Sequence, residues 1–225
     1  MAGNVHYPPL MIEGTVYGVA LNDRRELARL AGQFAASPYK EPPRAPVLYI
    51  KPRNTYAPHG AAVPVPAEIA EIEASAAIAV LFGRDATAVS ESEAVDCVLG
   101  YSLAIDLSEP AGSYYRPAIS EKCRDGFLPI GPHLVAAEKI DDPGALTVEL
   151  EIDGRPAGAL PMAELARSIP KLIAEISAFM TFRRGDVLLT GLTPPGARAR
   201  LGSRISAVAP GLGRLDCTLV PEAAA

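Results

Sequence analysis

The sequence predicts an α+β fold, built from mixed β-sheets with a few peripheral helices. Three observations support this prediction. The 22 prolines and 19 glycines among 225 residues exclude a helix bundle, because both residue types weaken helix interiors. Most apolar segments are short and rich in β-branched residues, as strands are. The predicted helices stand alone between groups of strands, unlike the regular alternation of a parallel α/β protein.

The first half of the chain contains strands joined by proline-rich connectors. A helix is predicted over residues 24–36, with Asn22 or Asp23 as its N-cap. Ser90 and Glu93 have the spacing of a capping box, which predicts a short helix to about Cys97. The predicted strands of this half are residues 14–21, 47–50, 71–83 and 98–107. The last two are almost continuously apolar, so we expect them to be buried on both faces.

The second half contains a hairpin, a helix and closing strands. The dipeptide Asp153-Gly154 lies between alternating segments and predicts a tight hairpin turn. A helix is predicted over residues 162–181, with a break near Pro170 and a new N-cap at Ser168. The predicted strands of this half are residues 146–152, 155–160, 187–191, 203–209 and 214–220. We expect a single domain, in which residues 1–45 form an appendage on a core of residues 46–220.

Composition excludes several classes of function. The formal net charge is −5 and no basic stripe is present, which disfavours a nucleic-acid partner. No apolar stretch approaches the roughly 20 residues that span a membrane. The three cysteines are far apart in the sequence and predict reduced thiols in a cytoplasmic protein. Walker, G-x-G-x-x-G and G-x-S-x-G motifs are absent from the sequence.

Carboxylates within apolar strands are the first candidates for chemistry. Asp106 lies inside SLAIDL, where an unpaired charge is costly. Glu71 and Glu73 share one face of the preceding predicted strand, and with Asp106 they would suit an oxygen-ligated cation such as Mg²⁺. Two structural alternatives stay open. Asp106 could be satisfied by backbone donors, and the glutamates could mark the solvated start of a strand.

A cationic loop is the second candidate. Residues 114–126 contain Arg116, Lys122 and Arg124 among glycine, proline and tyrosine, and such a loop could bind carboxylates. A similar polar segment begins at Lys51, directly after a buried strand. Either segment could instead be an ordinary solvated loop. Together they supply the remaining candidate substrate contacts, which are Lys51, Tyr115, Arg116, Arg124 and Asp125.

In this order, these segments resemble the fumarylacetoacetate hydrolase superfamily over roughly residues 14–220. The segments that match are LYIKPRNT (48–55), FGR (82–84), VLGYSLAIDLS (98–108), YYRPAISEKCRDGFLPIGP (114–132), EIDGRP (151–156) and EISAFMTFRRGDVLLTG (175–191). The resemblance is greatest to the N-terminal half of isomerase/decarboxylases that act in 4-hydroxyphenylacetate (homoprotocatechuate) catabolism. It implies a β-sheet roll, a dimer, and Mg²⁺ or another divalent cation that chelates a 2-oxo acid.

The resemblance assigns roles to several residues. Asp106 matches a metal-ligand aspartate, and Lys122 matches an active-site lysine. A substrate-facing T-G-T-P segment corresponds to Thr190, Gly191 and Thr193, although Leu192 interrupts it. Arg116 and Arg124 are placed as carboxylate clamps by their charge and position.

Two departures from the superfamily pattern affect the expected chemistry. The positions of its metal-binding Glu-x-Glu pair hold Ser75 and Ala77 here. Glu71 and Glu73 keep the spacing but lie four residues earlier, about 13 Å along an extended strand. Hydrolytic members carry a His–Glu dyad near the N-terminus, whereas residues 22–26 contain no histidine, so carbon–carbon hydrolysis is not expected.

Three functional hypotheses follow. The first is an isomerase/decarboxylase of 2-oxo-ene di- or tricarboxylates in aromatic meta-cleavage catabolism. Asp106 would be metal ligand or base in it, and Lys122 the acid or electrostatic group. The second is a metal-poor companion of a homologous, metal-competent subunit, so the dimer could be homomeric or heteromeric. The third is a carboxylate-binding protein without turnover.

Overall fold

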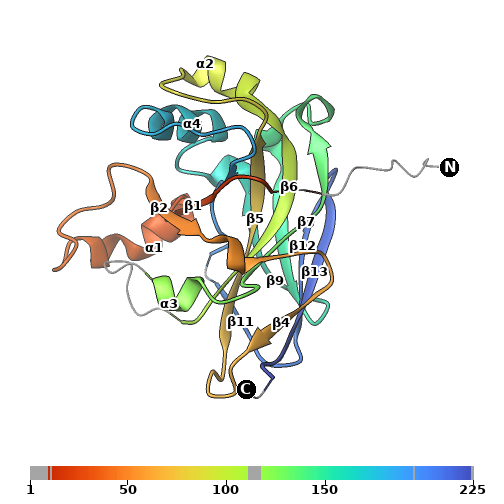
Figure 1. The fold of residues 1–225 in the computed structure, drawn as a ribbon. Helices are drawn as coiled ribbons and strands as arrows, with labels where there is room; N and C mark the ends of the chain where they lie inside the picture. Colours follow the sequence, from red (N-terminus) through yellow and green to blue (C-terminus); the bar gives the residue numbers. More distant parts are fainter. Residues whose placement is uncertain (1–9, 11, 111–117, 195, 224–225) are drawn as a thin grey trace.

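Two sheets pack face to face in the computed structural model, which describes residues 10, 12–110, 118–194 and 196–223 (Figure 1). The larger sheet has the order β2-β1-β10-β5-β6-β7-β3, and β11 also pairs with β5. Its strands are β1 (Val16–Ala20), β2 (Val47–Lys51), β3 (Tyr56–Ala57), β5 (Ile72–Phe82), β6 (Val98–Ser108), β7 (Leu128–Ala136), β10 (Val187–Leu189) and β11 (Ala197–Ala199). The smaller sheet has the order β4-β13-β12-β8-β9. Its strands are β4 (Ala61–Val65), β8 (Thr147–Ile152), β9 (Arg155–Pro161), β12 (Arg204–Ala209) and β13 (Gly213–Pro221).

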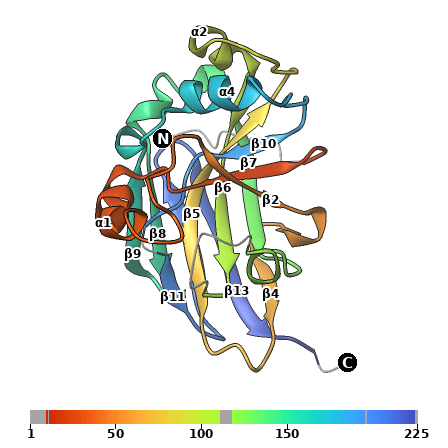
Figure 2. The same cartoon turned by 90° about the vertical axis from the view of Figure 1, so that its left-hand side faces the viewer.

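Short helices lie around the sheets. They are α1 (Arg24–Phe34), α2 (Glu91–Ala94), α3 (Ile119–Lys122) and α4 (Ile169–Ser177). Single 3₁₀ turns cover Arg53–Thr55, Val95–Cys97, Ala137–Lys139, Pro143–Ala145 and Met162–Glu164. Helices α2 and α4 pack together at one end of the sheets, while α1 and α3 lie on the side that Figure 2 turns toward the viewer. This arrangement confirms the predicted α+β class.

The two faces of the larger sheet pack differently. Even-numbered residues of β5, such as Ile78 and Val80, join the main core with side chains of the smaller sheet. Odd-numbered residues point the other way, because side chains alternate along a strand. Ala77 and Ala79 form a second apolar cluster there with Ala104 of β6. That outer face is also where Asp106 lies, two residues after Ala104.

Most predicted elements are confirmed, and the long helix is the main error. The Ser90–Glu93 capping box starts α2, and Asp153 and Gly154 form the hairpin turn with positive φ. The helix predicted over residues 162–181 is wrong in its first part, because α4 begins only after its N-cap, Ser168. The backbone just before α4 makes other hydrogen bonds. The Ala166 amide donates to the Asn22 carbonyl, and the Arg167 amide donates to the Asn22 side chain. At the start of the predicted helix, the chain forms only the single 3₁₀ turn Met162–Glu164.

Strands β4 and β7 were missed because prolines interrupt them. Pro64 lies in β4, an edge strand of the smaller sheet where a missing N–H costs little. Pro129 and Pro132 lie in β7, inside the segment that sequence patterns described as a loop. The division at residue 45 stays a prediction, although β1 pairs with both β2 and β10 inside the sheet. No helix in the described part of the chain is long and apolar enough to cross a membrane.

A charge network on the smaller sheet gives a prediction about acid stability. Burial raises the pKa of the Asp216 carboxyl, but hydrogen bonds from Ser206, Arg204 and Arg214 outweigh it and lower that pKa to about 2. A depressed carboxyl pKa stabilises the fold above the unfolded value, near 3.8, and loses that effect as pH falls toward 2. Asp216→Asn is therefore expected to cost about 2 kcal/mol at pH 7 and little near pH 2.

Urea unfolding at pH 7, 4 and 2 measures this difference. The matched control is Asp96→Asn, because Asp96 is 68% exposed in a 3.6 Å ion pair with Arg84. It is expected to change the free energy of unfolding by less than about 1 kcal/mol. An equal loss for Asp216→Asn at pH 7 and pH 2 would contradict the assignment.

Candidate active site on the outer face of the larger sheet

Asp106 is the centre of a polar cluster on β6. Its side chain is fully buried, and the ammonium nitrogens of Lys51 and Lys122 each lie 3.0 Å from its Oδ1. The Tyr49 hydroxyl donates a hydrogen bond to the other carboxylate oxygen, Oδ2. We call these four residues the Asp106 cluster. Residues 49 and 51 share one face of β2 because side chains alternate, so one edge strand supplies two members.

Lys51 is a fully buried cation held by oxygen atoms. Its Nζ donates to the carbonyls of Leu107, Lys122 and Phe127 at 2.9, 2.7 and 3.0 Å, in addition to its ion pair with Asp106. Burial lowers the pKa of Lys51 to about 8, although the Asp106 charge opposes this shift. The ammonium therefore joins three backbone segments at the end of β2.

The two lysines keep Asp106 ionised. Burial alone raises the pKa of this carboxyl, but the charges of Lys122 and Lys51 outweigh burial and hold the pKa below its usual value. Lys122 differs from Lys51 because its side chain is 19% exposed. Its ammonium lies 4.8 Å from the centre of the Tyr49 ring, a cation–π contact. Lys122 is thus the cation through which the cluster can meet a ligand.

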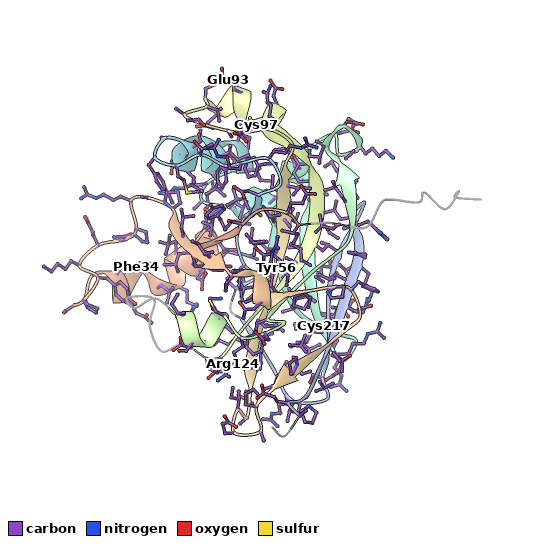
Figure 3. The ribbon with its side chains drawn as sticks, viewed as in Figure 1. Phe34, Tyr56, Glu93, Cys97, Arg124 and Cys217 are labelled. Carbon is purple, nitrogen blue, oxygen red and sulfur yellow. The ribbon has the colours of Figure 1, made fainter. Side chains whose placement is uncertain are left out.

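The loop after α3 is attached to the segment after β2. The Asn54 side chain donates to the Cys123 carbonyl and to Asp125, and the Gly126 amide donates to the Asn54 carbonyl. Arg124, labelled in Figure 3, donates through Nε to Glu109. The predicted contacts Asp125 and Arg124 therefore both have protein partners, and a ligand carboxylate would compete with Glu109 for Arg124.

The other predicted substrate contacts are differently placed. Tyr115 and Arg116 lie outside the described residues. The Thr190 hydroxyl bonds to the Ile78 carbonyl, and the Thr193 hydroxyl accepts from the Ala76 amide. Both threonines and the nearby Gly191 are buried, so this segment is attached to β5 through backbone groups. Their role in binding substrate stays a prediction.

Glu71 and Glu73 have cationic partners instead of forming a metal site. Glu71 pairs with Arg200 at 2.9 Å, and Glu73 pairs with Arg198 at 3.0 Å, both across the contact of β5 with β11. Within the described residues, no three His, Cys, Asp or Glu side chains gather closely enough to hold a metal ion. These ion pairs give the glutamates a structural role at the start of the strand.

The residues facing Asp106 also do not fit a divalent cation. Ser75 lies directly opposite Asp106 in the β5–β6 pairing, and its hydroxyl donates to the Thr193 carbonyl at 3.2 Å. A Cβ on Gly196 would lie 3.4 Å from that hydroxyl, so the chain already covers this position. Oδ1 of Asp106 faces two ammonium groups. A divalent cation would therefore meet one carboxylate and two positive charges.

This donor set predicts that divalent cations do not stabilise the protein. A bound ion adds RT ln(1 + [L]/Kd), about 0.4 kcal/mol when its concentration equals its Kd. Millimolar Mg²⁺ or Mn²⁺ is expected to leave the melting temperature of the EDTA-treated protein unchanged. Glu73→Ala should behave in the same way. A rise in melting temperature that Glu73→Ala removes would instead identify Glu73 as a ligand.

Sequence patterns missed Tyr49 and Glu109. Tyr49 sits in the middle of the apolar run VLYI, where a tyrosine usually signals a strand. Its role depends on the neighbouring β1 and on β6, 57 residues further along the chain. Glu109 directly follows β6, the buried strand that carries Asp106, and lies three residues after that aspartate. A second acid after such a strand is the only signal that could have identified it.

Comparisons with known proteins agree with this fold. The family model for the fumarylacetoacetate (FAA) hydrolase C-terminal domain matches residues 15–220. The chain is 40% identical over 211 residues to the 4-hydroxyphenylacetate degradation bifunctional isomerase/decarboxylase of Escherichia coli. That alignment covers 94% of this chain and 48% of the relative, so the chain spans about half the length of the relative.

Two solved structures share the fold. One is 5-carboxymethyl-2-hydroxymuconate delta-isomerase from Mycobacterium smegmatis, with a TM-score of 0.77, 24% identity, and 97% of this chain and 83% of that chain covered. The other is maleylpyruvate hydrolase from Sphingobium sp. SYK-6, a complex with manganese(II) and pyruvate. Its TM-score is 0.75 at 22% identity, with 93% of this chain and 71% of that chain covered. The sequence match over nearly the whole chain and the shared two-sheet fold lead to one conclusion: the chain belongs to the fumarylacetoacetate hydrolase family.

Proposed function

We propose that this chain is an isomerase/decarboxylase of 2-oxo-ene di- or tricarboxylates in 4-hydroxyphenylacetate (homoprotocatechuate) catabolism. The reactions would be isomerisation of 2-hydroxyhepta-2,4-diene-1,7-dioate and decarboxylation of 5-carboxymethyl-2-oxo-hex-3-ene-1,6-dioate. The observation that carries this proposal is the buried Asp106 carboxylate with two lysines, of which Lys122 is partly exposed. The bifunctional relative in Escherichia coli supports the choice of substrates.

Both reactions place negative charge on the oxygen at C2 of the substrate. Loss of CO₂ from the 2-oxo acid, or transfer of the 2-hydroxyl proton to water, leaves a dienolate, so a fixed cation near that oxygen lowers the barrier. Lys122 can supply this charge, and it can also donate a proton to the dienolate. Asp106 is fully buried between three donors, so in this proposal it holds and orients Lys122. Since the donor set around Asp106 does not fit a metal ion, we propose that Lys122 supplies the positive charge.

Negatively charged substrates also need cations at their far carboxylates. Arg124 is 36% exposed, and its partner Glu109 is 24% exposed, so both can respond to a ligand. The proposal assigns Arg124 to a substrate carboxylate that replaces Glu109. Arginine suits this role because its planar donors match a carboxylate. The protein would act in the cytoplasm as a homodimer or with a homologous subunit.

A companion-subunit role is the second candidate. It is favoured by Ser75 and Ala77 at the positions of the superfamily's glutamate pair. The test is to assay the purified chain alone for both reactions, and then with an added homologous subunit that carries the pair. Turnover by the chain alone would rule out the companion role. Turnover only after the addition would rule out independent catalysis.

A further inference from the structure

We infer that Tyr49 is a positioning residue of the site, which fixes Asp106 and Lys122 relative to each other. The inference rests on the proposed function, since it assigns a role within the same site. One tyrosine side chain contacts both groups. Its hydroxyl donates to Oδ2 of Asp106, and its ring lies 4.8 Å below the Lys122 ammonium.

The two oxygens of the Asp106 carboxylate have different partners. Both ammonium groups lie at Oδ1, while the Tyr49 hydroxyl takes Oδ2. A carboxylate held at one oxygen can still rotate about its Cβ–Cγ bond, because this torsion is broad. The bond from Tyr49 removes that freedom and keeps Oδ1 facing the lysines. Small displacements of a catalytic group reduce rates strongly, so this restraint affects turnover.

Gly18 on β1 has no side chain, and this leaves the space that the Tyr49 ring occupies. Gly18 is the direct partner of Tyr49 in the β1–β2 pairing. A Cβ on Gly18 would lie 2.1 Å from Cζ and 2.4 Å from the hydroxyl oxygen of Tyr49. The Tyr49 ring therefore lies against Gly18, and its hydroxyl extends to Asp106. Gly18→Ala would displace the ring without changing the tyrosine, and so provides an independent test.

The experiment compares three variants in turnover of the two proposed substrates. Tyr49→Phe keeps the ring and loses only the hydroxyl, so kcat is expected to fall about 10- to 100-fold with KM changed less than about threefold. Gly18→Ala should lower kcat in the same direction. Tyr56→Phe is the matched control, because the Tyr56 hydroxyl accepts from the Val16 amide on β1 instead of contacting Asp106. Its kcat should equal that of the wild type.

A double-variant cycle with Lys122→Met separates positioning from a general structural role. If Tyr49 acts through Lys122, Tyr49→Phe has no further effect once Lys122 is replaced. Independent, multiplying effects of the two changes, or an unchanged kcat in Tyr49→Phe, would overturn the inference.

A wild type without turnover would refute the proposed function, and the cycle is then run on another readout. That readout is the calorimetric affinity for 2-oxoadipate, an unreactive 2-oxo diacid, and the same non-additivity is expected. Neither turnover nor 2-oxoadipate binding in the wild type would overturn both proposals.

Discussion

Replacing Asp106 with asparagine is expected to lower the free energy of unfolding by about 3–5 kcal/mol at pH 7, because it removes one partner of a buried ion pair. Lys51 then keeps its place among three carbonyls without a counter-charge. The effect should depend on pH. With Asp106 present, Lys51 loses its proton near pH 8. Without Asp106, this pKa falls further, while the unfolded chain holds the proton to about 10.4.

The sign of the pH effect follows from the number of bound protons. Below pH 8, the folded and the unfolded wild type both carry the Lys51 proton. This group therefore causes no pH dependence of the wild-type free energy of unfolding in that range. The variant loses the proton in its folded state at lower pH, so its stability rises with pH over that range. The difference in free energy of unfolding between the wild type and Asp106→Asn should therefore shrink as pH approaches 8 and then stay constant. Urea unfolding between pH 6 and 9 measures it.

Two controls separate burial from charge. Glu41→Gln removes an exposed carboxylate that pairs with Arg44 at 2.6 Å, and should cost less than about 1 kcal/mol. Lys51→Met combined with Asp106→Asn should cost less than the sum of the two single changes, because it leaves no unpaired charge between these positions. Strict additivity would show that the pair does not interact as the structure indicates.

Lys122→Met is expected to lower kcat about 100- to 10,000-fold while changing the free energy of unfolding by little. Asp106 keeps Lys51 and Tyr49 as partners in this variant, and the side chain of Lys122 is already partly exposed. In the proposed reaction, the large expected effect comes from losing the cation that meets the oxygen at C2 of the substrate. Steady-state kinetics on both proposed substrates, together with thermal unfolding, provide the measurement.

The control for Lys122 is Lys171→Met on α4. Lys171 is 46% exposed and pairs at 3.8 Å with Glu175, in the helix that packs at the far end of the sheets. Its replacement should leave kcat unchanged. Retained turnover in Lys122→Met would refute the assigned role, whereas equal losses in both variants would point to a general effect of removing positive charge.

Local patterns predicted most of the fold because the decisive signals are local. The Ser90–Glu93 capping box, the Asp153-Gly154 turn and the apolar runs act over a few residues, and the structure confirms each. The errors have different causes, one tertiary and one local. Residues 165–167 are not helical because their backbone pairs with residues 22–23, and β7 was missed because its prolines break the usual strand pattern.

The site could be predicted only in part. An acid inside an apolar strand identified Asp106, and the polar segments identified Lys51 and Lys122. Sequence spacing also suggested a metal site at Glu71 and Glu73, yet their partners are Arg198 in β11 and Arg200 just after it, more than 120 residues later. Such long-range pairing has no local signal. The same holds for Tyr49, whose partner lies on a strand that is not its neighbour in the sheet.

The position of β2 at the edge of the larger sheet has a consequence for local opening. An edge strand normally frays easily and offers its free backbone groups to other chains. Here, peeling β2 away would pull the Lys51 ammonium from its four oxygen partners and break the Tyr49 bond to Asp106. We therefore expect the β2 amides paired with β1 to exchange with deuterium as slowly as those of β6. The edge of the sheet would then open only when the protein unfolds.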